Sequence, residues 1–302
     1  MNYASDIKPI YEELKKKFKQ DAASDEIADM LNSLYKITHS FLENLEIKEW
    51  DSKVEGKEYI SLLYNNKSTR AINKELYNAG LEISDVDIEG STYKYTPAEF
   101  LFHNIKDDKI TRQSAHDITV AIYSVAISFC SSIDLLKEND QKTPGTYFEI
   151  LMGFFYARTF GVNPRKQLEV LNIGERATLP TDFIFDLGDN RPKYHIPIKT
   201  STRERVVQVW SHQKVLDGVY GMGRFLGLLT CLAETNVSNK RNDVVEVCLP
   251  EQWQIYQSFI ARLTRIYYLD IPNKYRDLNE VFPKIHVKEF GEFFFEVEKL
   301  CE

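Results

Sequence analysis

The chain has 302 residues, of which 43% are hydrophobic and 27% charged, so one large domain, or a core with an appendage, can bury a sizeable apolar interior. Its 38 lysines and arginines against 45 acids give a net charge of −7, which argues against a protein that coats nucleic acid through a general basic surface. The N-terminus lacks the apolar stretch of a secretory signal, and the longest apolar runs are about half a membrane span, so we expect no membrane contact. The four dispersed cysteines have neither zinc nor disulfide spacing, and we therefore expect a cytoplasmic protein.

Residues 1–140 are predicted to form a largely helical N-terminal region, because apolar side chains recur at helical spacing in three of its segments. Residues 78–96 lack this period and predict a loop or a short strand. The polar segment 137–145 is the best candidate for a boundary between two regions. At its end, Thr143 followed by Pro144 predicts a helix start, with a threonine cap and a proline in the first turn.

Residues 141–302 are predicted to form a second region, in which strands lie between helices. The expected elements are a helix over 144–160, strands over 181–186 and 193–200, a helix over 203–216, strands over 225–234 and 243–250, and long helices to the C-terminus. This order predicts an α/β or α+β fold with a central mixed β-sheet flanked by helices.

Asp182 and Lys199 are predicted on one face of two adjacent strands, because residues two apart along a strand share a face. Phe183, Phe185 and Ile196 then lie on the opposite, apolar face. A carboxylate can hold Mg²⁺, and a lysine beside it can orient or activate water, which together suit cleavage of a phosphodiester. The alternative is an ordinary cross-strand ion pair on a solvated face.

Two further features lie near these residues. Glu149 is the one acid in the apolar helix YFEILMGFFYA, and a buried acid needs a partner or a metal, although it can also lie on a narrow polar stripe. Arg203, Glu204 and Arg205 open the next predicted helix. Arginine can donate two hydrogen bonds to guanine and glutamate can accept one from cytosine, so this run suits the reading of adjacent G·C pairs; an exposed charge cluster is the alternative. Residues 191–214 hold six basic residues and one acid, which concentrates positive charge there.

The order of these motifs resembles type II restriction endonucleases of the PD-(D/E)XK superfamily. The motifs are Glu149, then PTD ending at Asp182, then PIKTSTRER over 197–205, and the similarity covers about residues 144–217. Within that superfamily the chain resembles the branch that recognises CCGG and CCNGG, and the uninterrupted R-E-R is more similar to the members that read CCNGG. The resemblance implies Mg²⁺ as the cofactor, Asp182 and Glu149 as acids at the metal, and Lys199 as the catalytic lysine.

The chain departs from that pattern at the second acid. Pro197 stands where the general fold has Asp or Glu, and the branch instead carries an acid on the following helix, where this chain has His212 and Gln213. A neutral ligand supplies less charge to Mg²⁺, but a histidine can hold a water or act as a general base, so both residues are catalytic candidates. A surface histidine is the alternative.

Trp50 is an aromatic residue flanked by charges. Members that read CCNGG resemble base-flipping proteins, which stack an extruded base on an aromatic ring, so Trp50 is a candidate DNA-binding residue. A partly buried structural tryptophan is the alternative.

The sequence therefore predicts a type II site-specific deoxyribonuclease that makes Mg²⁺-dependent double-strand cuts at a short palindrome containing CC and GG. Because a palindrome is matched by a two-fold protein, we expect a homodimer on double-stranded DNA. A cognate DNA methyltransferase of the same restriction-modification system would be a functional rather than physical partner. The alternatives are a sequence-specific DNA-binding protein with a degenerate, non-cleaving nuclease fold, and an unrelated helical interaction protein.

Overall fold

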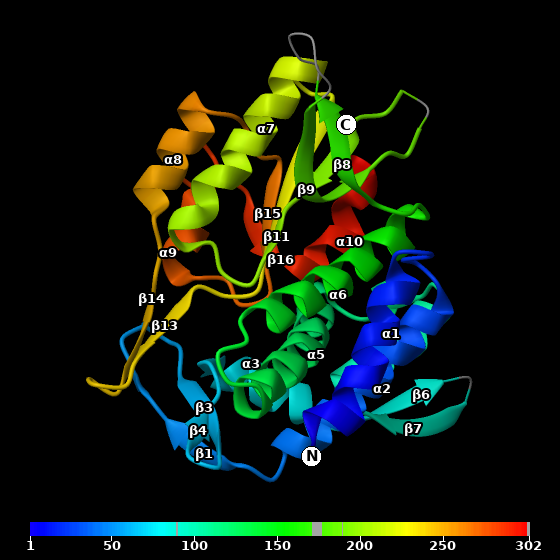
Figure 1. Cartoon of the computed structure of the whole chain (residues 1–302), viewed down its shortest axis with the longest axis vertical. Helices are drawn as coiled ribbons and strands as arrows, with labels where there is room; N and C mark the ends of the chain where they lie inside the picture. Colours follow the sequence, from blue (N-terminus) through cyan, green and yellow to red (C-terminus); the bar gives the residue numbers. More distant parts are fainter. Residues whose placement is uncertain (89, 171–176, 189, 301–302) are drawn as a thin grey trace.

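The structure, a computed structural model, describes residues 1–88, 90–170, 177–188 and 190–300, without the side chains of Glu204 and Arg205. In Figure 1 the N-terminal elements occupy the lower part, and the central sheet with α7 and α8 occupies the upper part. The two parts share one hydrophobic core, because a single buried cluster contains Leu14 and Phe129 as well as Phe148. The division near residue 140 stays a prediction.

The N-terminal region contains both helices and short strands. The predicted helices are present, but residues 46–73 also contribute short strands, most of them antiparallel, and residues 84–88 pair antiparallel with 91–95 where a loop or short strand was expected. Several of these strands have only two residues, which is too short for a periodic pattern to reveal. The elements are α1 Lys8–Phe18, α2 Asp25–Leu42, β1 Glu46–Glu49, β2 Asp51–Ser52, β3 Tyr59–Tyr64, β4 Lys67–Ser68, β5 Ile72–Asn73, α3 Lys74–Leu81, β6 Ser84–Ile88, β7 Ser91–Tyr95, α4 Pro97–Lys106 and α5 Ala115–Leu136.

Helix α5 is the longest apolar segment of the described chain. By length and hydropathy it could cross a membrane, so the prediction that the longest apolar runs reach only about half a membrane span is wrong for this helix, but 94% of its most apolar window is buried inside the fold. Its neighbours are α2, α3, α4 and α6. Helix α5 is therefore the core helix of the lower part.

Helix α6 (Lys142–Phe160) begins two residues earlier than expected. The Asp140 carboxylate accepts hydrogen bonds from the backbone N–H groups of Lys142 and Thr143, at 3.1 and 2.9 Å. Asp140 thus satisfies the free donors of the first turn, which was the role predicted for Thr143.

The central sheet is mixed, as predicted. Among the described residues its strands lie in the order β16, β15, β12, β10, β9, β8, and β11 continues β10 along β12. Strands β8, β9 and β10 are antiparallel, whereas β10, β11, β12, β15 and β16 pair in parallel. The bounds are β8 Arg165–Val170, β9 Ala177–Phe185, β10 Lys193–Ile196, β11 Ile198–Lys199, β12 Phe225–Cys231, β15 Arg265–Tyr268 and β16 Val287–Glu289.

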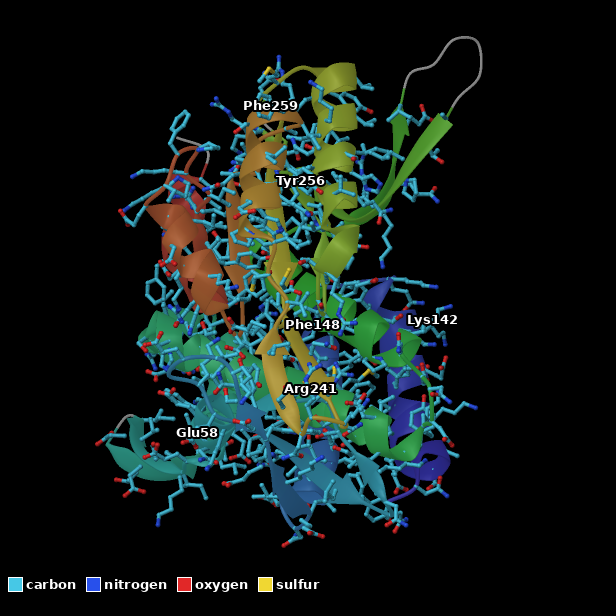
Figure 2. All side chains as sticks on the ribbon, turned by 90° about the vertical axis from the view of Figure 1, so that its left-hand side faces the viewer. Glu58, Lys142, Phe148, Arg241, Tyr256 and Phe259 are labelled. Carbon is cyan, nitrogen blue, oxygen red and sulfur yellow. The ribbon has the colours of Figure 1, made fainter. Side chains whose placement is uncertain are left out.

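Helices cover both faces of this sheet (Figure 1). On one face α6 packs on Phe183, Phe185 and Ile196 within the main core, which confirms their predicted common face. On the other face α7 (Val207–Tyr220) and α8 (Pro250–Phe259) meet through Trp210 and Trp253, with ring centroids 5.4 Å apart. In Figure 2, β8 and β9 form a two-stranded ribbon, drawn in green, beside α7.

The end of the chain differs from the prediction of long helices. After α8 it adds β15 and β16 to the parallel side of the sheet, followed by one-turn helices α9 Asn273–Arg276 and α10 Phe293–Glu296. Strands β13 Thr235–Ser238 and β14 Asp243–Glu246 form a hairpin that pairs with β2 of the N-terminal region. Figure 2 labels Arg241 in this hairpin, which lies over the lower part of the molecule.

Replacement of Gly153 by alanine should lower the free energy of unfolding by about 1–3 kcal/mol, because it overpacks the contact between α6 and β9. An added Cβ at this position would lie 2.7 Å from ring atoms of both Phe18 and Phe183. Urea unfolding measures the effect. Gly145→Ala is the matched control in the same helix, since its Cβ would meet nothing within 4 Å, and it should be neutral or stabilising. Equal effects of the two substitutions would contradict this packing account.

Candidate active site

A break in strand pairing brings Asp182 and Lys199 together. The antiparallel pairing of β9 with β10 ends at Ile196, and Pro197 follows, which has no N–H to donate to the ladder. The next residue, Ile198, donates its N–H to Asp182 Oδ2 at 2.8 Å, and Lys199 Nζ contacts the same oxygen at 2.6 Å. The proline thus ends the ladder where the carboxylate and the ammonium group meet.

Glu149 approaches this pair from α6. Burial, followed by the negative charge of Asp182, raises the pKa of Glu149, while the charges of Lys166 and Lys199 oppose the shift. Lys166 of β8 lies 3.3 Å from Glu149 and over the ring of Phe183, at 4.8 Å from its centroid. Two acids and two lysines therefore interact at this end of the sheet, and Lys166 is a member that the motif analysis did not identify.

A second Asp–Lys pair, between Asp186 just after β9 and Lys193 of β10, shows the contrast. Lys193 lies 2.5 Å from Asp186, and its hydrogen bond is the main cause that lowers the pKa of Asp186. The Asp186 carboxylate also accepts the N–H of Gly188. Asp186 is thus stabilised as an ordinary ion pair, whereas Asp182 lies beside another acid.

His212 of α7 faces the same place. It lines a cavity of about 220 Å³ together with Asp182, Pro197 and Lys199. Burial, and then the charge of Lys199, lowers the pKa of His212, while Asp182 opposes the shift. The ring is therefore neutral at pH 7, with a lone pair that can accept a hydrogen bond from water.

Gln213 does not face this cavity, which corrects its prediction as a catalytic residue. Its side chain is 1% exposed, and its amide nitrogen donates to the Phe225 carbonyl and to Asp217, both at 3.0 Å. Its amide oxygen therefore accepts from Nδ1 of His195, at 3.1 Å. Because successive helical residues point about 100° apart, only His212 of this pair can reach Asp182.

His195 lies below His212, with ring centroids 6.4 Å apart. It is fully buried, and desolvation lowers its pKa to about 4, so the ring is neutral. Its partner Gln213 fixes which ring nitrogen carries the hydrogen. His195 is therefore a buried residue of β10 and does not line the cavity.

The predicted base-reading run begins in a separate surface region. Arg203 is exposed, opens a 3₁₀ helix over Arg203–Val206, and has a left-handed backbone with φ of +39°. It lines a cavity of about 510 Å³ in which it is joined by Arg70 and Asp134 of the N-terminal region. The side chains of Glu204 and Arg205 lie outside the described part of the chain.

Trp50 is not available as a base-stacking ring, which corrects that prediction. It is 7% exposed and packs on Tyr59 and Val244, and its indole N–H donates to Ser61 Oγ at 2.8 Å. The ammonium of Lys48 covers the ring at 3.5 Å from its centroid. Trp50 is therefore a structural residue, because both its indole N–H and the face of its ring already have partners within the protein.

Replacement of Glu149 by glutamine should raise the melting temperature of the metal-free protein at pH 7. A raised pKa means that the native state disfavours the ionised carboxylate, so native stability falls as the pH rises from the ordinary pKa to the raised one. Glutamine avoids this cost, and its advantage should disappear below the ordinary pKa of glutamate. Glu280→Gln, which removes an exposed charge, is the control and should change little. A lower melting temperature of E149Q at pH 7 would contradict the expectation.

Comparison with known proteins gives a match in structure and none in sequence. No protein-family model and no curated protein matches the chain. The crystal structure of the type IIP restriction endonuclease Kpn2I superposes with a TM-score of 0.75 and 22% identity, over 97% of this chain and 96% of that chain. The complex of restriction endonuclease PspGI with substrate DNA gives a TM-score of 0.39 and 16% identity, over 75% of this chain and 86% of that chain. The match to Kpn2I shows that the chain has a restriction endonuclease fold, as predicted.

Proposed function

We propose that this protein is a Mg²⁺-dependent type II restriction endonuclease that cuts both strands of a short palindromic DNA site containing CC and GG, with CCNGG-like sites preferred. The observation that carries the proposal is the meeting of Asp182 and Lys199 at the break between β10 and β11, with Glu149 interacting from α6. Kpn2I is a type IIP restriction endonuclease, and the common fold over nearly the whole chain supports the same class of activity.

The acids at this site suit a magnesium ion. Both hydrogen bonds to Asp182 use Oδ2, so among the described residues Oδ1 receives none. Glu149 is a second carboxylate whose ionised form a nearby cation would favour. Mg²⁺ in phosphoryl-transfer sites binds to one or two carboxylates and completes its shell with water and phosphate oxygens, so Asp182 and Glu149 would hold it here.

The side chains around the cavity have distinct roles in the proposed reaction. Lys199 places a positive charge beside the scissile phosphate, where it stabilises the charge that develops on the phosphate oxygens and orients the attacking water. The neutral ring of His212 accepts a hydrogen bond from a water in the same cavity. When bound, Mg²⁺ supplies further charge neutralisation and acidifies a coordinated water.

Magnesium should raise the melting temperature of the wild-type protein, and the rise should be smaller for E149Q. A ligand that binds only the native state stabilises it by an amount that grows with the logarithm of its affinity, and the substitution removes one of the two proposed ligands. A thermal titration with MgCl₂ measures both shifts, with E280Q as the control that should behave like the wild type. An equal rise in E149Q would exclude Glu149 as a metal ligand without testing cleavage.

The proposed recognition element is Arg203, Glu204 and Arg205, which would read the C·G pairs through the major groove. It follows Lys199 by four to six residues, so reading and cleavage would be linked by one short segment. Because each chain would read one half of the palindrome, the active form would be a homodimer, and a cognate methyltransferase would protect the same sites.

A plasmid digest with Mg²⁺, followed by sequencing of the fragment ends, tests the proposal. Discrete fragments with a common sequence containing CC and GG, lost when EDTA is added, are the expected result. The absence of cleavage, or fragments with random ends, would overturn it.

A second candidate is a site-specific DNA-binding protein that does not cleave. His212 stands where the resembled branch has an acid, and no group of three potential metal ligands occurs among the described residues. This candidate predicts selective binding of the same DNA with no cutting at any Mg²⁺ concentration, so the same digest combined with a gel-shift assay separates the two.

A further inference from the structure

Glu234 is a buried carboxylate that binds the segment between the candidate catalytic lysine and the candidate base readers. It is 1% exposed and lies three residues after the end of β12. Its oxygens accept hydrogen bonds from Ser201 Oγ at 2.8 Å, from the Thr202 N–H at 2.8 and 3.0 Å, and from Thr202 Oγ1 at 2.6 Å. The Arg203 N–H at 3.4 Å and the Tyr268 hydroxyl at 2.9 Å are further donors.

The sheet places this carboxylate where strand pairing ends. Strand β11 pairs in parallel with β12, and the pairing continues through the N–H of Leu232 to the Lys199 carbonyl and the N–H of Ala233 to the Thr200 carbonyl. Beyond Thr200 the carboxylate of Glu234 takes the place of backbone partners. It therefore ties the residues after Lys199 to the rigid centre of the sheet.

The bound segment contains a backbone conformation that needs support. Arg203 has φ of +39°, which is unfavourable for a residue with a side chain and persists only where its surroundings impose it. The Glu234 carboxylate holds the peptide groups on the N-terminal side of Arg203. The exposed side chain of Arg203 is therefore attached to a backbone whose position is fixed by Glu234.

We infer that Glu234 is a positioning residue for DNA recognition, which acts by holding residues 201–203 so that Arg203 meets base edges in one geometry. The inference rests on the proposed function and extends it to a residue that touches neither metal nor phosphate. Glu234 is not among the residues that line the Asp182 cavity, so its effect should fall on the choice of sequence. Glutamine cannot replace it, because the amide nitrogen would face donors.

The matched control is Glu296, a partly buried carboxylate whose tyrosine partner, Tyr267, precedes the tyrosine partner of Glu234 in the chain. Tyr267 donates to Glu296 at 2.6 Å, as Tyr268 does to Glu234, and Arg265 and Lys288 are its other partners. Glu296→Gln therefore removes the same negative charge and disturbs a similar number of hydrogen bonds, but it does so at a carboxylate that does not contact residues 201–203.

The experiment compares E234Q and E296Q, each in the Lys199→Ala background so that DNA is not cut. Gel-shift titrations with the cognate duplex from the plasmid digest, and with a scrambled duplex, give a selectivity ratio. We expect the ratio to fall about tenfold or more for E234Q, the scale of one lost bidentate base contact, and to stay unchanged for E296Q. Thermal melting checks that both variants are folded. Thr202→Val, which removes one donor and keeps the carboxylate, is the milder variant and should lower the ratio less.

Hydrogen exchange provides a readout that does not depend on DNA. The amides of Thr202 and Arg203 should exchange faster in E234Q and normally in E296Q. If the K199A parent binds the cognate duplex selectively, then unchanged amide exchange or unchanged selectivity in E234Q would overturn the inference about Glu234. Either result would leave the proposed function standing. If the parent protein itself binds no sequence selectively, the proposed function fails and the recognition role of Glu234 fails with it.

Discussion

Replacement of Lys199 by alanine should lower the rate of DNA cleavage by at least about 10²–10³-fold, which is the usual cost of removing one group that stabilises charge in a transition state. Lys199 Nζ lies 2.6 Å from Asp182 Oδ2 and borders the cavity that His212 also lines. In the proposed reaction this ammonium group is next to the phosphate and water, and alanine leaves no charge there.

Site-specific binding should survive this substitution. The candidate base-reading run begins at Arg203, and residues 201–203 are held by Glu234 and not by Lys199. Single-turnover cleavage of a labelled duplex and gel-shift titration of the same duplex measure the two properties. Retained cutting, or loss of cutting together with all selective binding, would contradict the assignment of Lys199.

The matched control is Lys193→Ala. Lys193 of β10 pairs with Asp186, the residue that follows β9, so the substitution removes the same kind of side chain from a nearby ion pair. It should leave the cleavage rate within a small factor of the wild type. A similar loss in both variants would mean that the effect comes from general charge, and not from the position of Lys199.

Replacement of Arg203 by alanine should weaken binding to the cognate site by about 1–3 kcal/mol, which is the discrimination provided by one good bidentate contact to a base. Binding to random DNA should weaken much less, because there the arginine contributes only one charge to the phosphate attraction. The Arg203 side chain is exposed, and Glu234 binds the backbone N–H of Arg203 and not its side chain. Alanine at this position therefore leaves the contact with Glu234 in place.

Lys214→Ala is the control for charge in this experiment. Lys214 is an exposed residue of α7 in the same basic segment, and its loss should weaken cognate and random binding alike. Affinities are compared at several salt concentrations, since phosphate contacts are salt-dependent. If Arg203→Ala also reduced both affinities equally, Arg203 would be a phosphate contact and not a base reader.

Local patterns in the sequence were sufficient for the strands around Asp182 and Lys199. Alternation of apolar residues placed Phe183, Phe185 and Ile196 on the core face, and the structure confirms it. Such a pattern depends only on the period of a strand, so it can be read without knowing the partner strands. The mixed sheet between helices was predicted from the order of strands and helices along the chain.

Other elements depended on contacts that no local pattern records. Strands β2 and β15 pair with segments distant in sequence, β14 and β12, so no local pattern records their partners. Trp50 looked suitable for stacking because charged residues flank it in sequence, but Tyr59 and Val244 cover it in space.

For the candidate site, the residue types could be predicted from the sequence: an acid, a lysine, a helix acid and an arginine-rich run, in an order that resembles restriction endonucleases; their chemical roles stay predictions. The tertiary structure decided which candidates share one place. It directed His212 to the cavity of Asp182 and turned Gln213 toward His195, and it placed Glu234, 35 residues after Lys199, against the chain that follows the lysine. The physical reason is that a side chain's direction depends on the packing of its helix or strand against neighbours distant in sequence, which the residue types alone do not specify.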